Sequence, residues 1–432
     1  MARILQGIKE LSDSIHWSSL YTCLCIMLGT GILQLPYTLR QGGWLACALI
    51  VVVAFMATYT GKVLILCLYS RPTSEGTAEL LLERGGDTPK PFEGSDENRM
   101  VSYAELGYEA FGRAGEVTTQ IVHKANQVGV SALFLILAAG FMEELMGKLP
   151  TSTYVLICGA IVSPVVMFSP NYKEMAFLSF LGVSASMCVV VVVVVIGSMQ
   201  HIQGEIEDRH HDLFLSKTFA SSFAAITLSF GGHANFPTVE ADMPDRRKFG
   251  TTVSATFATL ASIYVPVAVV GYYVYGDEVE SPVLDSLPAS GIFPRLTKIW
   301  ITFHVLSSYP ILLLDTAIEL QVLLKLPKKE ESPRLELVLR YLLRFGLVAV
   351  TVTFAYFIPF FADVMSLVGA TCVAGTVFLM PCAFNLKLRW HNMSKAEVLL
   401  NVVIFMAGSI GGVIAAKQAF SSLVDKVRNG DD

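Results

Sequence analysis

Two short stretches within long apolar runs contain residues that suit neither a helix interior nor contact with lipid. They are MLGTGILQLP, residues 27–36, and LSFGGHANFP, residues 228–237. Each combines glycines and a hydroxyl side chain with a following proline, so a helix would lose backbone hydrogen bonds there. Freed N–H and C=O groups, with hydroxyl and imidazole side chains, can bind a small polar molecule. The chemistry expected of both stretches is therefore recognition of such a molecule.

The two stretches correspond in spacing. Gly31 and Pro36 are five residues apart, as are Gly232 and Pro237, and both pairs are offset by 201 residues. Interrupted apolar segments at matching positions of two halves point to a transporter binding site. Half-helix N-termini attract a carboxylate, and unwound carbonyls accept hydrogen bonds from an ammonium, so an α-amino acid fits both. The alternative is a simple kink in which the glycines allow close helix packing.

The elements that must position these stretches are membrane-spanning helices. The chain is 53% hydrophobic and only 16% charged, which is a membrane-protein composition. Apolar runs of about twenty residues predict spanning helices, and the run of valines at 189–195 cannot be a barrel strand because it does not alternate. The eleven predicted spans are 16–40, 43–70, 116–146, 152–169, 175–199, 218–241, 249–276, 293–324, 336–358, 361–385 and 396–420.

Charge distribution predicts the orientation. With the N-terminus in the cytoplasm, 18 lysines and arginines fall on the inner side and nine on the outer side, which agrees with the positive-inside rule. An odd number of spans then places the C-terminus outside or in a lumen. Residues 71–101 are predicted to form a flexible acidic cytoplasmic loop. Ser102, followed by Glu105, predicts the start of a short helix.

Several function classes are disfavoured. No basic patch suggests nucleic acid, and there is no HExxH, GxSxG or clustered His/Asp set typical of an enzyme. The eight cysteines contain no CxxC pair, so a zinc site is not expected. We expect no cofactor, the lipid bilayer and an amino acid as the partners, and a monomer.

Five stretches spread along the chain resemble the amino acid/auxin permeases. They are GTGILQLPYTLRQGGW (29–44), SYAELGYEAFG (102–112), SFGGHANFPTVEADM (229–243), GYYVYGDEV (271–279) and LSSYPILL (306–313). The most similar branch is that of the vacuolar and vesicular neutral amino acid transporters, which includes the vesicular inhibitory amino acid transporters.

The resemblance implies one all-α transmembrane domain over residues 1–425. It would hold two inverted five-helix repeats, about 16–199 and 218–385, with broken helices one and six and an extra helix at about 396–420. It also implies proton-linked transport of amino acids by alternating access, at a vacuolar or vesicular membrane rather than the plasma membrane.

The candidate substrate-binding residues follow from the two stretches and from the resemblance. Thr30 is expected to bond a carboxylate and Phe230 to close the pocket over the substrate. The family implies that helices three and eight form the opposite wall. The predicted set is Gly29, Thr30, Gly31, Ser229, Phe230, Gly231, Gly232 and His233, with Gln127, Ser307, Ser308 and Tyr309 from the opposite wall.

The group that carries a coupling proton is not settled by the sequence. His233 is one candidate, because histidine titrates near physiological pH, although an interior histidine bonded to freed carbonyls is equally compatible. Gln127 departs from relatives that have a carboxylate there, and an amide carries no proton. Asp315, four residues before Glu319 on the eighth span, is the other candidate. Glu240 is expected to pair with the neighbouring DRRK segment at the cytoplasmic surface.

Three alternatives to proton-coupled transport remain open at this point. A uniporter would need no proton carrier. Sodium coupling would use oxygens from the broken first helix and from the eighth, where Ser307 and Ser308 are suitable. An amino acid sensor on the same fold would bind its ligand without moving it, although only about 15 residues precede the first span.

Overall fold

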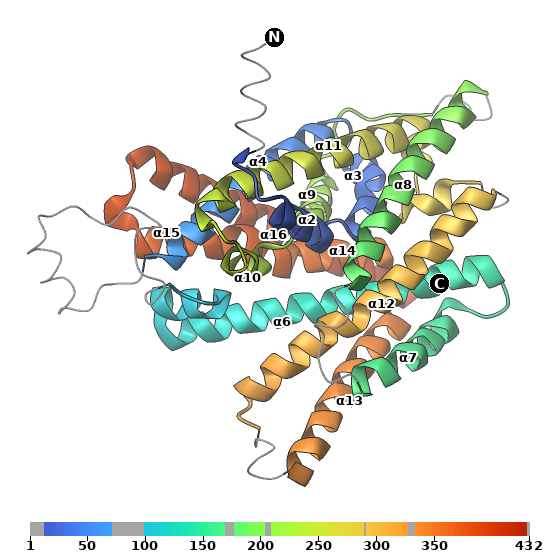
Figure 1. Ribbon diagram of the computed structural model, residues 1–432. Coiled ribbons are helices and arrows are strands. Elements are labelled where there is room, and N and C mark those ends of the chain that lie inside the picture. Colours follow the sequence, from blue (N-terminus) through green and yellow to red (C-terminus); the bar gives the residue numbers. More distant parts are fainter. Residues whose placement is uncertain are drawn as a thin grey trace, which may run out of the picture.

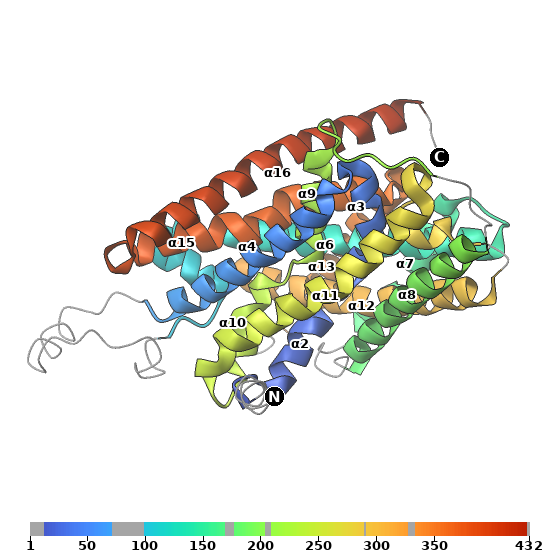
Figure 2. The same ribbon diagram turned by 90° about the horizontal axis from the view of Figure 1, so that it is seen from above.

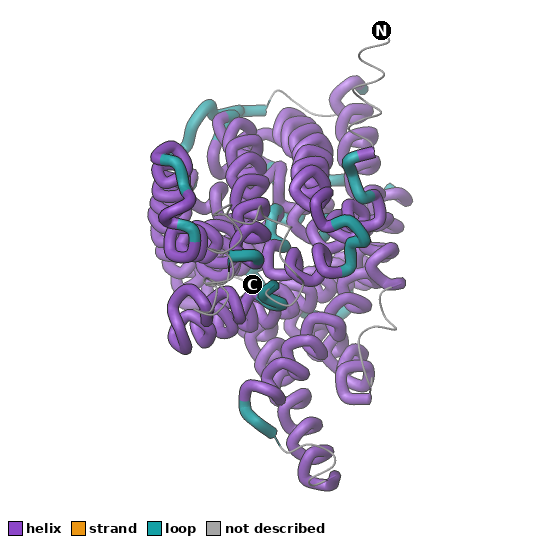
Figure 3. Tube along the Cα trace, turned by 60° about the vertical axis from the view of Figure 1, so that its left-hand side comes forward, coloured by secondary structure: helices purple, strands orange, loops and turns teal. Residues whose placement is uncertain are grey.

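The computed structural model describes residues 13–70, 99–168, 177–203, 209–288, 291–326 and 333–429. Within these ranges every regular element is a helix, as predicted. Figure 3 shows the helices joined by short connections. Most of the predicted acidic loop, residues 71–98, lies outside the described residues.

The first and sixth predicted spans are each broken into two half-helices. The first consists of α2 (Trp17–Met27), the 3₁₀ turn η1 (Thr30–Gln34) and α3 (Leu35–Gly42), and it bends by 50° at the break. The sixth consists of α9 (Phe219–Ser229), η4 (His233–Asn235) and α10 (Phe236–Ala241). Both prolines lie in the first turn of the second half-helix, where a backbone N–H would have no intrahelical acceptor, so its absence breaks no helical hydrogen bond. The predicted breaks are confirmed.

The other predicted spans are continuous helices. Among the described residues, nine unbroken helices have the length and apolar composition to cross a membrane. They are α4 (Leu45–Leu68), α6 (Tyr103–Met146), α7 (Thr151–Phe168), α8 (Phe177–Ile202), α11 (Phe249–Tyr275), α12 (Ile292–Leu323), α13 (Pro333–Phe357), the run from α14 (Phe361–Val368) to α15 (Met380–Leu388), and α16 (Lys395–Asn429).

Two of these helices depart from regular geometry. In α6 the predicted short helix from Ser102 leads directly into the third span, with a kink at Phe111 and Gly112, whose φ is +64°. Ser102 accepts a hydrogen bond from the Glu105 N–H at 3.2 Å, so the predicted cap is present. Two π-helical turns, η8 (Gly369–Val373) and η9 (Gly375–Leu379), join α14 to α15, where the sequence predicted a regular helix.

The broken helices lie among the continuous ones. Figure 1 shows α2 and α10 near the middle of the molecule, with α6 and α12 running past them on one side. The pair α4 and α11 packs around the breaks, α7 and α13 pack outside α6, and α16 lies along one edge against α9 and α14 (Figure 2). Exposed apolar side chains such as Phe55, Phe345 and Val413 lie on the outward faces, as contact with lipid requires.

The start of the first span and the end of the last span lie beside different helix ends. The start of α2 lies beside the connection between α10 and α11, where Lys248 Nζ donates to the Asp13 carbonyl at 2.8 Å. The end of α16 lies beside the start of α14, where Lys426 Nζ bonds Asp363 at 2.6 Å. We call the first end the inner end and the second the outer end.

A buried ion pair fixes the inner half-helix α10. Arg99 donates from Nε to Glu240 at 2.9 Å and from Nη2 to the Pro237 carbonyl at 2.7 Å. Tyr69, at the end of α4, also donates to Glu240. Glu240 is fully buried, so its predicted pairing with the surface DRRK segment is wrong. The reason is that the chain returns from beyond α4 and places Arg99 against this carboxylate.

Replacing Arg99 by alanine is expected to destabilise the protein strongly. The change leaves the Glu240 carboxylate buried without its cation, which typically costs about 3–5 kcal/mol. Arg113→Ala removes an exposed ion pair with Glu116, which is worth less than about 1 kcal/mol. Thermal unfolding of both purified variants measures the difference, and equal melting temperatures would contradict the assigned role of Arg99.

Candidate functional site

The two helix breaks lie directly against each other. A Cβ on Gly31 would come within 2.6 Å of Ser229 Oγ and 2.8 Å of Ser229 Cα, and one on Gly232 would come within 2.7 Å of Met27 Cε. Each break therefore places a glycine against the end of the other broken helix. These two corresponding glycines are required for the close approach, which explains their matched spacing in the sequence.

One side chain is bonded to both breaks. Tyr264 of α11 is fully buried, and its hydroxyl lies 3.0 Å from the Ser229 carbonyl and 3.2 Å from the Met27 carbonyl. Met27 ends α2 and Ser229 ends α9. Carbonyls of the last helical turn have no intrahelical donor, so this hydroxyl satisfies groups that the breaks leave open.

A cavity of about 180 Å³ lies beside the crossing of the breaks. Seven residues of the predicted set line it. They are Gly29, Thr30, Gly31, Gln127, Ser229, Gly231 and Gly232. A Cβ on Gly29 would meet nothing within 4 Å, because this glycine borders the open space. The structure thus brings both unwound segments and helix α6 together around one small space.

Two predicted residues of the sixth span face away from this cavity. His233 is fully buried; its Nε2 lies 3.0 Å from the Ala57 carbonyl and 3.1 Å from Thr60 Oγ1, both on α4. Phe230 is also fully buried and packs edge-on against Tyr264, with ring centroids 5.2 Å apart. Neither residue lines the cavity, because the turn at the break directs both side chains into the protein interior.

The predicted residues of α12 also lie away from the cavity. Tyr309 bonds Thr351 of α13 at 2.5 Å, and Ser308 Oγ lies 3.3 Å from His304 Nδ1 on its own helix. Ser307 is half-buried and is not among the lining residues. The helix instead reaches the cavity one turn later, at Leu312.

Other lining residues were not predicted. Five of them come from one face of α6, at the spacing of three and four residues that helical periodicity gives. They are His123, Asn126, Val130, Leu133 and Phe134. These positions could have been predicted by stepping three and four residues along α6 in both directions from Gln127. Val373 and Thr376 come from the π-helical turns, for which the sequence offered no signal.

The small cavity continues into a larger one at the inner end. This inner cavity has a volume of about 760 Å³, and the two share Ile26, His123 and Gln127 among their lining residues. It lies between α2 and α10 on one side and α6 and α12 on the other. A separate outer cavity of about 760 Å³ shares no lining residue with the central one. The central cavity is therefore open toward the inner end.

A polar network joins the central cavity to the inner one. Gln127 Nε2 donates to Asp315 Oδ2 at 2.5 Å, and Gln127 Oε1 accepts from Thr316 at 2.6 Å and from Lys124 Nζ at 3.5 Å. Lys124 also pairs with Glu319. Lys124 is buried, contrary to the usual position of a lysine at the membrane surface.

His123, Asp315 and Glu319 form the group of possible metal ligands found among the described residues. Their donor atoms lie within 4.8 Å of one another. Because the Lys124 ammonium pairs with Glu319, the protein places its own cation in this cluster.

A second set of charges lies at the outer end. Buried Lys298 of α12 forms an ion pair with Asp285 at 2.9 Å and also pairs with Glu144 at the end of α6. Asp285 lies in the turn η7 (Val283–Ser286), outside the spans. Burial raises the pKa of Asp285 to about 7, and Lys298 opposes that shift.

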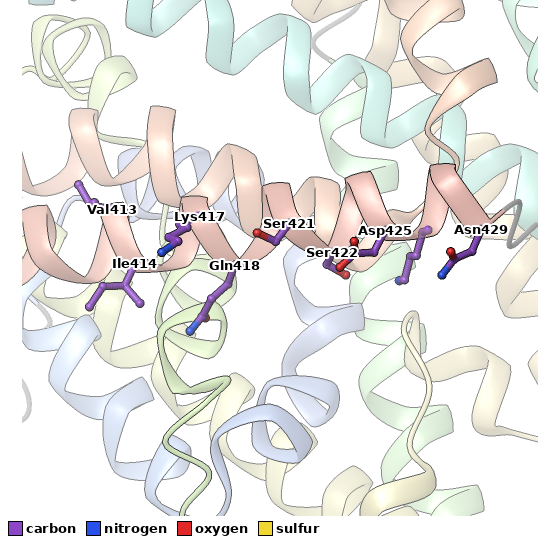
Figure 4. A pocket seen from close by; sticks show the side chains of 9 residues that line it. Val413, Ile414, Lys417, Gln418, Ser421, Ser422, Asp425 and Asn429 are labelled. Carbon is purple, nitrogen blue, oxygen red and sulfur yellow. The ribbon is translucent and has the colours of Figure 1, made fainter.

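A further groove, of about 720 Å³, runs along the outer half of α16 (Figure 4). Its lining residues, from Val413 to Asn429, all belong to this one helix. No second element of the described chain lines it, so it is not a candidate for the binding site.

Comparison with solved structures identifies the fold. A Na⁺-coupled sialic acid symporter matches with a TM-score of 0.52 and 11% identity, over 95% of this chain and 89% of that one. A manganese transporter from Eremococcus coleocola matches with a TM-score of 0.50 and 12% identity, over 93% of this chain and 85% of that one. These matches confirm the predicted fold class, an all-α membrane protein.

Relatives in sequence cover nearly the whole chain. Amino acid transporter AVT1H of Arabidopsis thaliana is 25% identical over 98% of this chain and 93% of its own length. The vesicular inhibitory amino acid transporter of Xenopus tropicalis is 25% identical over 95% of this chain and 78% of its own length. Residues 13–79 and 87–420 match the model of the transmembrane amino acid transporter protein family, and the chain belongs to this family of membrane transporters, as its sequence predicted.

Proposed function

We propose that the protein exchanges a small neutral amino acid for protons across a vesicular or vacuolar membrane, with Asp315 as the proton carrier. The observation that carries the proposal is the bond between Asp315 and Gln127, which joins a titratable group to the central cavity. The vesicular inhibitory amino acid transporter among the relatives supports both the substrate class and the compartment.

The central cavity suits a small zwitterion. Its volume is about 180 Å³. Roughly six water molecules occupy this volume in the liquid, and a small amino acid is of similar size. Backbone groups of Gly29, Thr30 and Gly31 border it at the start of the outer half-helix, whose dipole favours a carboxylate. The apolar side chains of Val130, Leu133 and Phe134 border one side of it and disfavour a charged substrate side chain there.

The proton is sensed through the orientation of an amide. Lys124 and Thr316 both donate to Gln127 Oε1, so Gln127 Nε2 must face Asp315 and donate to it. An ionised carboxylate accepts this bond, whereas a protonated carboxyl can present its own donor instead. Protonation of Asp315 would therefore weaken the bond to Gln127 and change the wall of the central cavity. In this way a glutamine takes part in coupling without binding the proton itself.

The arrangement of cavities supports alternating access. With the N-terminus in the cytoplasm, the inner cavity faces the cytoplasm, and the outer charges lie on the lumenal side. One proton moving down a gradient of two pH units supplies about 2.7 kcal/mol. That free energy supports roughly a hundredfold accumulation of substrate.

Asp315→Asn is expected to abolish accumulation driven by a pH gradient. The asparagine keeps a similar shape but cannot release a proton, so the gradient no longer drives net movement. Exchange of labelled for unlabelled amino acid across proteoliposomes, which needs no net proton movement, should persist. Both activities are measured with a panel of amino acids, with pH and sodium gradients imposed separately.

Glu116→Gln is the matched control for this experiment. Glu116 also lines the inner cavity, but it pairs with exposed Arg113 at the surface. Its variant should keep accumulation driven by the pH gradient. Accumulation by Asp315→Asn at the wild-type level would show that another group carries the proton. Binding of amino acid without any movement would favour a sensor.

Gly31→Ala should reduce transport by roughly five- to 150-fold, whereas Gly346→Ala on α13 should be far milder. The added methyl group on Gly31 meets Ser229 and forces the two breaks apart, an overpacking that costs about 1–3 kcal/mol, and 1.4 kcal/mol corresponds to tenfold. The same group on Gly346 meets nothing within 4 Å, and Gly346 lines none of the cavities described above. Uptake per molecule of reconstituted protein measures both, and the opposite order would contradict the crossing of the breaks as the working site.

A further inference from the structure

Two helix ends of the same polarity meet where the broken helices cross. Met27 is the last residue of α2 and Ser229 is the last residue of α9. The C-terminal end of a helix carries a partial negative charge on its free carbonyls. Two such ends directed at one point repel each other unless a cation or a hydrogen-bond donor lies between them.

Tyr264 supplies the donor at this point. Its hydroxyl lies 3.0 Å from the Ser229 carbonyl and 3.2 Å from the Met27 carbonyl, so a single O–H group lies between both ends. In transporters with broken helices, unwound carbonyls and half-helix C-termini are the groups that bind a coupling Na⁺ or proton. A neutral side chain of α11 therefore occupies a position suited to a cation.

The ring of Tyr264 is held in place independently of its hydroxyl. It packs edge-on against Phe230, and Phe230 in turn packs against Phe257 with ring centroids 6.0 Å apart. Phe257 and Tyr264 lie two turns apart on α11, so these aromatic contacts fix where the hydroxyl points. The hydroxyl can thus be removed by substitution while the packing of the ring is kept.

We propose that the Tyr264 hydroxyl stands in for a coupling cation between the two helix breaks, so that the protein holds this crossing together without sodium. Tyr264 is then a positioning residue: it does not border the central cavity but fixes the two segments that do. The inference rests on the proposed transport function and adds that sodium has no role at this crossing.

The test is Tyr264→Phe, studied by thermal unfolding of purified protein in sodium chloride and in choline chloride at equal ionic strength. Phenylalanine keeps the ring and leaves the two carbonyls facing an unfilled position. Wild-type protein should melt at the same temperature in both salts. Tyr264→Phe should melt lower than wild type in choline, and sodium should raise its melting temperature in a saturable manner, because a ligand that binds only the folded state stabilises it.

Tyr275→Phe is the matched control on the same helix. Its hydroxyl donates to Gln200 Oε1 at 2.8 Å, near the outer end of α11 and away from the breaks. This variant loses one hydrogen bond and should show no sodium-specific stabilisation. The proposal is overturned if Tyr264→Phe melts like the wild type, or if sodium stabilises it no more than it stabilises Tyr275→Phe.

Uptake by the wild-type protein provides a second test that needs no variant. Replacement of sodium by choline at constant pH gradient should leave the initial rate unchanged. A fall of tenfold or more would overturn the proposal, since a cation would then be needed. A protonophore distinguishes this result from failure of the proposed function: uptake that resists both the protonophore and sodium removal contradicts proton coupling but upholds the role of Tyr264.

Discussion

The structure depends on how backbone polar groups are satisfied where two helices stop inside the membrane. Each unpaired N–H or C=O group in a lipid environment costs several kcal/mol, so a break persists only if other groups of the protein or a ligand bind what it frees. Here the breaks satisfy part of this requirement together. Gly31 and Gly232 allow the two broken helices to touch, and the Tyr264 hydroxyl lies within hydrogen-bond distance of a carbonyl at each helix end. The groups that remain open border the central cavity, where a zwitterion can bind them.

The same constraint explains which residues the sequence revealed. Glycine and proline within an apolar run directly indicate a break, so both broken helices, their matched offset and six of the cavity residues followed from local pattern, whereas Gln127 followed from the family resemblance. His233 and Phe230 lie in the same stretch, yet their side chains turn toward α4 and α11. The direction in which a side chain points at an irregular turn depends on the local backbone conformation, and residue type alone does not specify that conformation.

Long-range contacts were the least predictable part of the site. The pairing of Arg99 with Glu240 joins positions 141 residues apart, and the bond from Gln127 to Asp315 spans 188 residues. Both depend on how the helices pack, so charge patterns near each residue gave either the wrong partner or none. The π-helical turns that bring Thr376 to the cavity have no sequence signal either. Helical periodicity along α6, by contrast, held the information for His123 and Asn126.

The bonds divide the helices around the inner cavity into two groups. On one side of the inner cavity, α2 is tied to α11 by the bond of the His16 N–H to Thr252 Oγ1 and by Tyr264, while Arg99 and Tyr69 tie α10 to the end of α4. On the other side, Gln127 and Thr316 join α6 to α12. The inner cavity lies between these two bonded groups of helices. The proposed alternating access would close the inner end by bringing α2 and α10 toward α6 and α12, and the Asp315 network lies on the face that they would cover.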